Sequence, residues 1–211
     1  MKKYVLLLLT IFIFHSLQAQ LEQLDGVISE EEESQLRLIG ENGSSSMFID
    51  TSSDYSVRVI IKSEKLYVAS LCVCNEKNEV IVMHASSALG DQTYIQSNDT
   101  WSTEDTFKWE VREVALTAEI IEKRRQYLEK HGWVANTVSM GKGGETEFFI
   151  NRKLLEKSGA SFALGLMTES DPENIIGIPA VGSGDCADFK LVSGDPATHY
   201  SFNPEKWIKI R

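Results

Sequence analysis

After its first twenty residues, the 211-residue sequence has no apolar run long enough to cross a bilayer, no excess of basic residues and no internal repeat. It carries 21 Lys and Arg against 31 Asp and Glu, a formal net charge of −10. An acidic balance of this size argues against nucleic acid and anionic membrane surfaces as partners. There is also no G-x-S-x-G nucleophile elbow, and the glycine-rich loop 141–144 lacks the spacing of a phosphate-binding loop.

Metal-binding and haem-binding residues are scarce and badly spaced. The sequence has four histidines, none at metal-pair spacing with another: His15, His84, His131 and His199. Met83 and His84 are adjacent, so on a strand they project to opposite faces and do not ligate one haem iron. Calcium at Asp185 and Asp188 is an alternative, but a turn held by its own side chains is favoured. We therefore expect neither a metal nor a cofactor.

The N-terminal segment has the pattern of a secretory signal peptide. Lys2 and Lys3 form a positive start, the run 5–14 is almost wholly apolar, and Ala19 supplies a small residue before a cleavage point. We therefore expect residues 1–19 to be removed on export, to the periplasm, the cell surface or the extracellular medium. Residues 20–211 are expected to form one domain with no membrane span.

Only three cysteines are present, Cys72, Cys74 and Cys186. Export permits disulfides, and Cys72 and Cys74 are two apart in an extended run, so they share one face of a strand. Cys186 pairs with either of them and leaves one thiol over, or all three remain buried free thiols.

The rest of the chain alternates short β-branched and aromatic runs with polar turns, which predicts about ten strands. Runs 56–62, 66–74 and 80–84 are separated by hairpin-length turns, whereas 42–46 is expected to be a loop. Residues 117–131 differ: Thr117 is a helix N-cap, Gly132 a C-cap, and the apolar residues between them repeat at helical spacing. The sequence therefore predicts a mainly β, two-sheet, mostly antiparallel β-sandwich with one inserted α-helix at about 117–131.

A second, shorter helix start lies at Ser29 and the four glutamates after it. Ser29 is a suitable N-cap, and Glu32 is placed to complete a capping box. Adjacent glutamates point in different directions, so a solvated helix face is favoured over a cluster of catalytic carboxylates.

Three segments, in order, resemble the family 9-like carbohydrate-binding modules and the related DOMON domains. They are Leu24–Ile28, which is similar to the "DG.I...E" opening of the family; Val57–Ser70, similar to its "V.V.YD..NLYVA" strand pair; and Glu147–Leu164, similar to its late "E..IP...L...G....FN" segment. Residues 79–101 resemble bacterial secreted members of this superfamily. The resemblance implies a two-sheet sandwich that binds and does not catalyse. It transfers no sugar site, because no tryptophan pair of this chain matches the family motif.

Sugar binding requires exposed aromatic rings with polar groups around them. The candidates are Tyr94, Trp101, Trp109 and Trp133. Trp109 alternates with Phe107 and Val111, which favours a core position, whereas Trp101 lies in a polar run, 97–102, predicted to be a loop. Trp101 with Tyr94 is therefore the predicted ligand platform, with a Trp that merely covers the end of a sheet as the alternative.

His84 is the third candidate binding residue, in the stretch VMHASSALGDQTY at 82–94. Ser86, Ser87 and Asp91 follow it closely, which leaves a secreted hydrolase as the rival function. The small residues here favour a crossing between two strands. We therefore expect an exported, non-catalytic domain that binds a carbohydrate or other small ligand, with a hydrolase or a structural cell-envelope module as alternatives.

Overall fold

The computed structural model describes residues 30–63, 66–86, 91–97, 100–107, 117–139, 144–155, 160–168, 174–180, 186 and 202–210. The predicted signal peptide, residues 1–19, lies outside this part of the chain, as do Trp109, Asp185, Asp188 and the predicted strand 189–192. The helices are α2 (Glu30–Gln35), α3 (Ala118–His131), α4 (Arg152–Leu155) and the 3-10 helix η1 (Pro204–Lys206). The strands are β1 (Arg37–Asn42), β2 (Ser45–Asp50), β3 (Ser56–Ser63), β4 (Leu66–Cys74), β5 (Val80–Ser86), β6 (Asp91–Ser97), β7 (Thr100–Phe107), β8 (Trp133–Ser139), β9 (Gly144–Asn151), β10 (Ser161–Thr168), β11 (Ile176–Ile178) and β12 (Ile208–Lys209).

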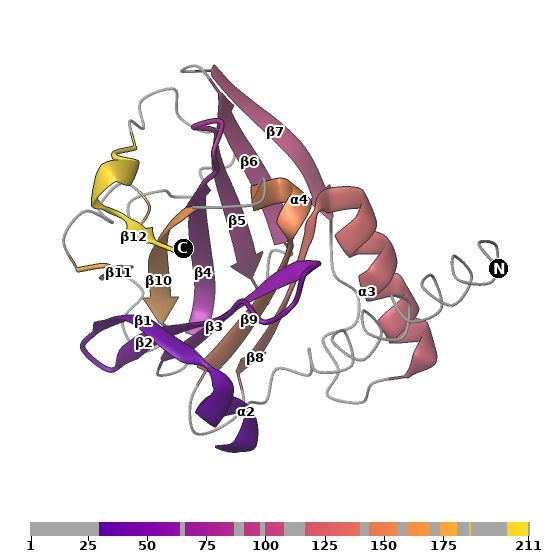
Figure 1. Cartoon of the computed structure of the whole chain (residues 1–211), viewed down its shortest axis with the longest axis horizontal. Helices are drawn as coiled ribbons and strands as arrows, with labels where there is room; N and C mark the ends of the chain where they lie inside the picture. Colours follow the sequence, from indigo (N-terminus) through magenta and orange to yellow (C-terminus); the bar gives the residue numbers. More distant parts are fainter. Residues whose placement is uncertain are drawn as a thin grey trace, which may run out of the picture.

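The strands form two antiparallel sheets (Figure 1). The five-stranded sheet has the order β1-β2-β3-β9-β8. The seven-stranded sheet has the order β11-β10-β4-β5-β6-β7, and β12 also pairs with β10. This architecture confirms the predicted mainly β sandwich with an inserted helix.

The main core lies between the two sheets and follows the alternation of each strand. Val57, Val59 and Ile61 of β3 and Phe148 and Ile150 of β9 point into it from the five-stranded sheet. The other sheet contributes a matching set: Ala69, Leu71, Val73, Ile81, Met83, Ala85, Phe162, Leu164 and Leu166. Alternate residues therefore belong to the outer faces of the two sheets.

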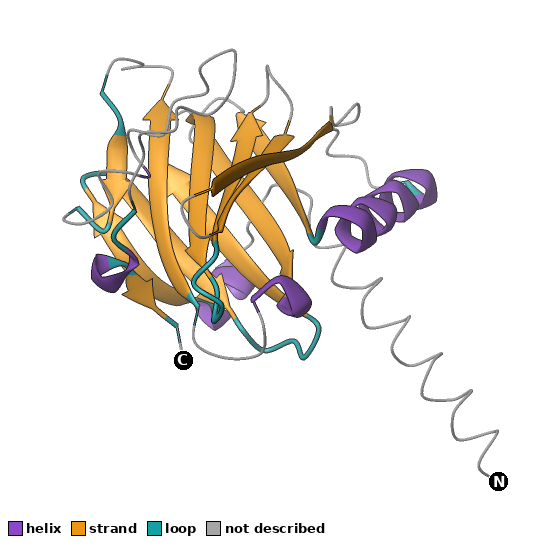
Figure 2. Cartoon of the chain, turned by 90° about the horizontal axis from the view of Figure 1, so that it is seen from above, coloured by secondary structure: helices purple, strands orange, loops and turns teal. Residues whose placement is uncertain are grey.

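Helix α3 covers part of the outer face of the five-stranded sheet. Its Leu128 packs with Val134 of β8 and Phe149 of β9. Ile121 N donates to Thr117 O at 3.1 Å, and Gly132, with φ +78°, takes the left-handed conformation after the helix. The predicted helix and both its ends are thus confirmed, and Figure 2 shows it lying along the side of the strands.

Three sequence predictions about local structure were wrong. The expected loop at 42–46 is the two-residue turn of a β1–β2 hairpin, with Asn42 opposite Ser45. Strand β8 begins directly after Gly132, although no strand was predicted there. Trp101 lies in β7 and pairs with Gln96, so its polar run is a hairpin and not a loop. Strand β7 is largely polar and has none of the aliphatic runs on which the prediction depended.

Candidate functional site

The three predicted binding residues lie on three neighbouring strands. His84 is in β5, Tyr94 in β6 and Trp101 in β7. Their backbone positions are described, whereas their side chains lie outside the described part of the structure. The register of the strands therefore determines which face each position belongs to.

The strand register places all three positions on the same face of the seven-stranded sheet. Val82 of β5 packs with Cys72 and Trp207 in a cluster on the outer face of the seven-stranded sheet. Its neighbours Ile81 and Met83 belong to the core between the sheets. Tyr94 pairs directly with Val82, and residues directly opposite share a face. His84 is two residues beyond Val82 and therefore lies in the same set of rows.

Trp101 follows by the same argument across the next strand pair. It is opposite Gln96, which is two residues from Tyr94, so it is diagonal to Tyr94 across β6 and β7. Diagonal neighbours of this kind lie about 7–8 Å apart, within reach of aromatic side chains. The sequence thus placed Trp101 in the wrong element, but it grouped His84, Tyr94 and Trp101 on what is one face of one sheet.

The adjoining part of the same outer face is covered by the C-terminal part of the chain. Cys72 of β4, opposite Val82, forms a disulfide with Cys186, with a Cα–Cα distance of 6.0 Å. Trp207 is 3% exposed and packs in the same cluster, with its ring edge-on to Phe202. The disulfide therefore anchors residue 186 beside the row that contains Tyr94.

The disulfide resolves the alternatives left open by the sequence. Cys186 pairs with Cys72, and Cys74 remains a buried free thiol. Cys72 and Cys74 share one face of β4, as predicted. Burial raises the pKa of the Cys74 thiol, which suppresses the thiolate form.

Trp133 is not part of a ligand platform. It is fully buried in β8, with its ring centroid 5.8 Å from that of Phe148. It lies in the core between the sheets, so its candidacy as a sugar-binding ring was wrong. Trp133 directly follows the helix C-cap, and the residues of its strand show no clear hydrophobic alternation by which the strand could be recognised.

A second polar cluster lies on the outer face of the five-stranded sheet. The Arg58 guanidinium donates to Glu147 Oε1 at 2.6 Å and, through both terminal nitrogens, to Glu32 Oε1 at 3.1 Å. Lys62 Nζ donates to Glu33 Oε2 at 2.6 Å and lies 5.8 Å from the centre of the Phe48 ring. Burial lowers the pKa of Arg58, but attraction by Glu147 and Glu32 outweighs it and raises that pKa overall.

This cluster was missed from the sequence, which predicted a solvated face for the glutamates after Ser29. Glu30 and Glu33 are exposed, as predicted, but Glu32 and Glu33 also form ion pairs with β3. Arg58 and Lys62 alternate with core residues Val57, Val59 and Ile61, which was the available signal for an outward-facing cationic pair. Their partners are 26 to 89 residues away in sequence, beyond the reach of local patterns.

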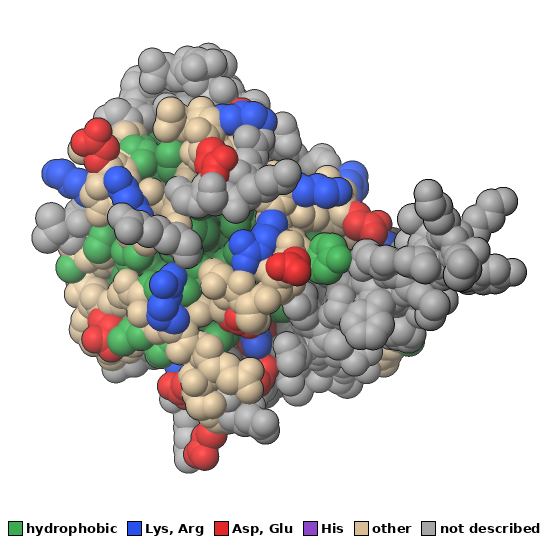
Figure 3. Space-filling model, in the orientation of Figure 1, with side chains coloured by type: hydrophobic (Ala, Val, Ile, Leu, Met, Phe, Trp, Pro, Cys, Tyr) green, Lys and Arg blue, Asp and Glu red, His purple; other side chains and the backbone are tan. Residues whose placement is uncertain are grey.

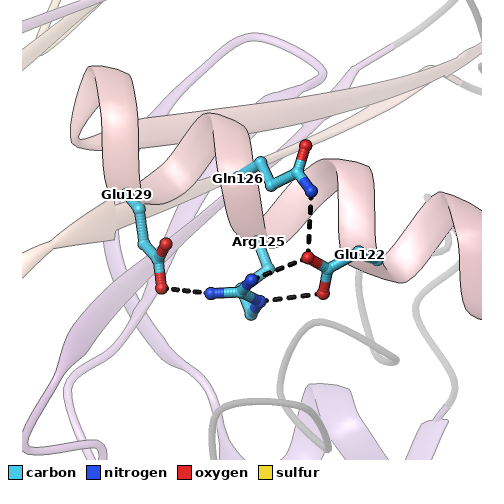
Figure 4. A network of polar contacts seen from close by, with 4 residues as sticks. All are labelled: Glu122, Arg125, Gln126 and Glu129. Atoms are coloured by element: carbon cyan, nitrogen blue, oxygen red, sulfur yellow. Dashed lines mark hydrogen bonds and ion pairs between the residues drawn. The ribbon is translucent and has the colours of Figure 1, made fainter.

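Helix α3 carries an exposed charge network on the side away from the sheet (Figure 4). Arg125 donates to Glu122 through two nitrogens and to Glu129, and Gln126 donates to Glu122. Hydrogen bonds from Arg125 and Gln126 lower the pKa of Glu122 to about 2. These i,i+3 and i,i+4 contacts stabilise the helix itself.

Within the described ranges, no group of three or more His, Cys, Asp or Glu side chains is placed to hold a metal ion. None of the helices in those ranges is long and apolar enough to cross a membrane. Figure 3 shows basic, acidic, hydrophobic and uncharged polar side chains interspersed over one face of the molecule. Among the described residues of that face, no broad field of one sign of charge is seen.

The sequence matches no known family model and no curated protein. A structure from Bacteroides uniformis, described as that of a proposed carbohydrate-binding protein, is 6% identical, covers 65% of this chain and 74% of its own, and has a TM-score of 0.41. A family 9 carbohydrate-binding module from Caldicellulosiruptor kristjanssonii, in complex with cellotriose, is 10% identical, with coverages of 69% and 71% and a TM-score of 0.35. Its glucose complex is 11% identical, with coverages of 70% and 75% and a TM-score of 0.34. Similarities at these scores assign neither a family nor a ligand to this chain.

Proposed function

We propose that this chain is an exported, non-catalytic binding domain for a carbohydrate or another small ligand. The ligand binds the outer face of the seven-stranded sheet, over β5, β6 and β7. Tyr94 and Trp101 supply the aromatic contact and His84 a polar one. Residues 20–211 act as the single folded unit.

The observation that carries the proposal is the shared face of these positions. Tyr94 and Trp101 are diagonal neighbours on adjacent strands, and His84 occupies the same set of rows. Gln92 lies opposite His84 and Gln96 opposite Trp101, so amide-bearing residues alternate with the aromatic one along β6. Aromatic positions surrounded by hydrogen-bonding groups are what recognition of a sugar ring requires.

Two further features support export and binding. The N-terminal segment has the pattern of a signal peptide, and the Cys72–Cys186 disulfide is of the kind that persists in oxidising compartments. The sequence resemblance to family 9-like carbohydrate-binding and DOMON-like domains points to a binding module. The proposed location is the periplasm, the cell surface or the extracellular medium.

The test is a glycan-array screen of the mature protein, followed by titration calorimetry with any glycan that binds. Trp101→Ala and Tyr94→Ala should each weaken binding at least about tenfold, as expected for the loss of a stacked ring. Tyr55→Ala is the matched control, because Tyr55 is an exposed aromatic residue outside this face. It should bind as the unmodified protein does.

Three results would count against the proposal. An array without binders would reject a glycan ligand. Equal affinity of Trp101→Ala and the control would reject the site while leaving binding intact. Hydrolysis of a bound glycan or of a chromogenic ester, abolished by His84→Ala, would favour the rival hydrolase.

A further inference from the structure

Helix α2 is attached to the sandwich through ion pairs with β3. Its six residues are Glu-Glu-Glu-Glu-Ser-Gln, so it brings no apolar side chain to the sheet. Glu32 pairs with Arg58 and Glu33 with Lys62, and both cations belong to β3. Figure 1 shows α2 beside the five-stranded sheet, directly before β1.

The helix has little stability of its own. A six-residue helix is far below the length at which isolated helices persist in water, so its contacts with the sheet have to hold it in place. The ion pairs with Arg58 and Lys62 therefore determine both the position of α2 and its helical state.

The sheet beneath does not depend on α2 to the same degree. Arg58 keeps a second partner, Glu147, whose side chain is fully buried and lies 2.6 Å away. Glu32 is by contrast 22% exposed and Glu33 45% exposed, so water and salt reach the outer pairs first. The inner pair and the sandwich core can remain intact when the outer pairs break.

The ion pairs around Arg58 and Lys62 show which contacts would be lost if α2 detached from the sheet. Glu32 and Glu33 of α2 and Glu147 of β9 form ion pairs with Arg58 and Lys62 of β3. Detachment of α2 would remove Glu32 and Glu33 from the two cations. Asp50 of β2, opposite Arg58, and Glu145 of β9, opposite Lys62, are positions in the sheet itself and would stay beside them.

We propose that α2 is an electrostatic strap that detaches from the folded sandwich as ionic strength rises, uncovering Arg58 and Lys62. Salt screens the partly exposed outer pairs far more than the buried Arg58–Glu147 pair. The strap is thus a local opening equilibrium, separate from global unfolding and from the ligand face on the other sheet.

Hydrogen exchange measured by mass spectrometry, on the mature protein, tests this directly. The variant Glu32→Gln/Glu33→Gln should speed exchange of the α2 amides on the order of three- to tenfold, the loss expected for two partly exposed pairs. Exchange in β3 and β9 should stay unchanged. Glu30→Gln is the matched control, because Glu30 lies in the same helix and is exposed, and it should exchange as the unmodified protein does.

A salt series supplies the second measurement. Going from low salt to about 1 M should speed α2 exchange in the unmodified protein and in Glu30→Gln, but much less in Glu32→Gln/Glu33→Gln, whose outer pairs are already lost. Unchanged α2 exchange in the double variant would overturn the proposal. Equal acceleration in α2, β3 and β9 would overturn it as well, because the opening would then be global.

Discussion

The Arg58 guanidinium donates to the Glu147 carboxylate at 2.6 Å across the β3–β9 pair, with Arg58 6% and Glu147 0% exposed. Breaking a buried pair by removing one partner leaves an uncompensated charge inside the protein. We therefore expect Glu147→Ala to lower the free energy of unfolding by about 3 kcal/mol, measured by urea denaturation. Glu32 still faces Arg58, which keeps the loss near the lower end of the usual range.

Two further variants separate this effect from a general loss of charge. Glu33→Gln removes the half-exposed partner of Lys62 and should cost at most about 1 kcal/mol. Replacing both members, as Arg58→Met with Glu147→Leu, should recover much of the stability lost by Glu147→Ala, because neither charge of this pair is then left buried without its partner. A cost of Glu147→Ala no greater than that of Glu33→Gln would show that the buried pair is not required.

The second prediction concerns the thiols. With Cys72 and Cys186 joined, the native protein should offer no reactive thiol to Ellman's reagent, because Cys74 is buried and its raised pKa suppresses the thiolate. Unfolding in urea should expose one thiol, and reduction followed by unfolding should expose three. Three thiols in the unreduced, unfolded protein would contradict the disulfide.

The disulfide should also contribute measurably to stability. It joins residues 114 apart in sequence, and its loss should lower the free energy of unfolding by about 2–5 kcal/mol. The comparison is Cys72→Ala/Cys186→Ala against Cys74→Ala in urea denaturation. A Cys74→Ala variant that loses more stability than the double variant would show that packing, and not the cross-link, supports this face.

The sequence predicted the parts of the fold whose signal is local. The β-branched runs predicted strands β3, β4 and β5, and the capping residues predicted both ends of helix α3. Glu119 and Lys123 form an i,i+4 ion pair in α3, and Asn151 Oδ1 accepts a hydrogen bond from Lys153 N at the start of α4. Each of these features depends on residues within about four positions of one another.

The missed features depend on distant partners. The run 93–96 was predicted as a strand and lies in β6, whereas β7 was missed because it is largely polar and is defined by its pairing with β6. Arg58 meets Glu147 only because β3 and β9 are neighbours, 89 residues apart in sequence. The selection of His84, Tyr94 and Trp101 as binding residues stays a prediction, although strand register places them on one face.

The third prediction concerns pH and helix α3. Hydrogen bonds from Arg125 hold the folded-state pKa of Glu122 at about 2, below its ordinary value of 4.5. A depressed carboxyl pKa stabilises the folded state above the unfolded value, and this stabilisation is lost as pH falls from about 4.5 towards 2. The difference in unfolding free energy between the unmodified protein and Glu122→Gln should therefore shrink between pH 6 and pH 3.

The matched control is Glu119→Gln, which removes a carboxylate from the same helix without altering the contacts of Arg125. Urea denaturation at each pH gives both differences. If both variants change the free energy of unfolding by the same amount at each pH, the effect comes from the total charge of the helix and not from the Arg125–Glu122 contact. A Glu122→Gln difference that stays constant with pH would contradict the depressed pKa.

The fourth prediction tests how the two sheets close at one edge. At Gly40 in β1, an added Cβ would lie 2.5 Å from Ile178 Cγ2 and 2.8 Å from Ile208 Cδ1. Ile178 is fully buried and its Cγ2 lies close to its own backbone, so the neighbours cannot simply swing away. Gly40→Ala should therefore lower the free energy of unfolding by about 1–3 kcal/mol, measured in urea.

Gly43 provides the matched glycine control. It lies in the turn of the same hairpin with φ +61°, and an added Cβ there meets nothing within 4 Å. Asn tolerates this left-handed conformation, so Gly43→Asn should leave stability nearly unchanged. If Gly40→Ala were as stable as Gly43→Asn, β1 would not pack closely on Ile178 and Ile208. The hydrogen bond from Asn42 Nδ2 to Gly177 O would then be the main contact closing this edge of the sandwich.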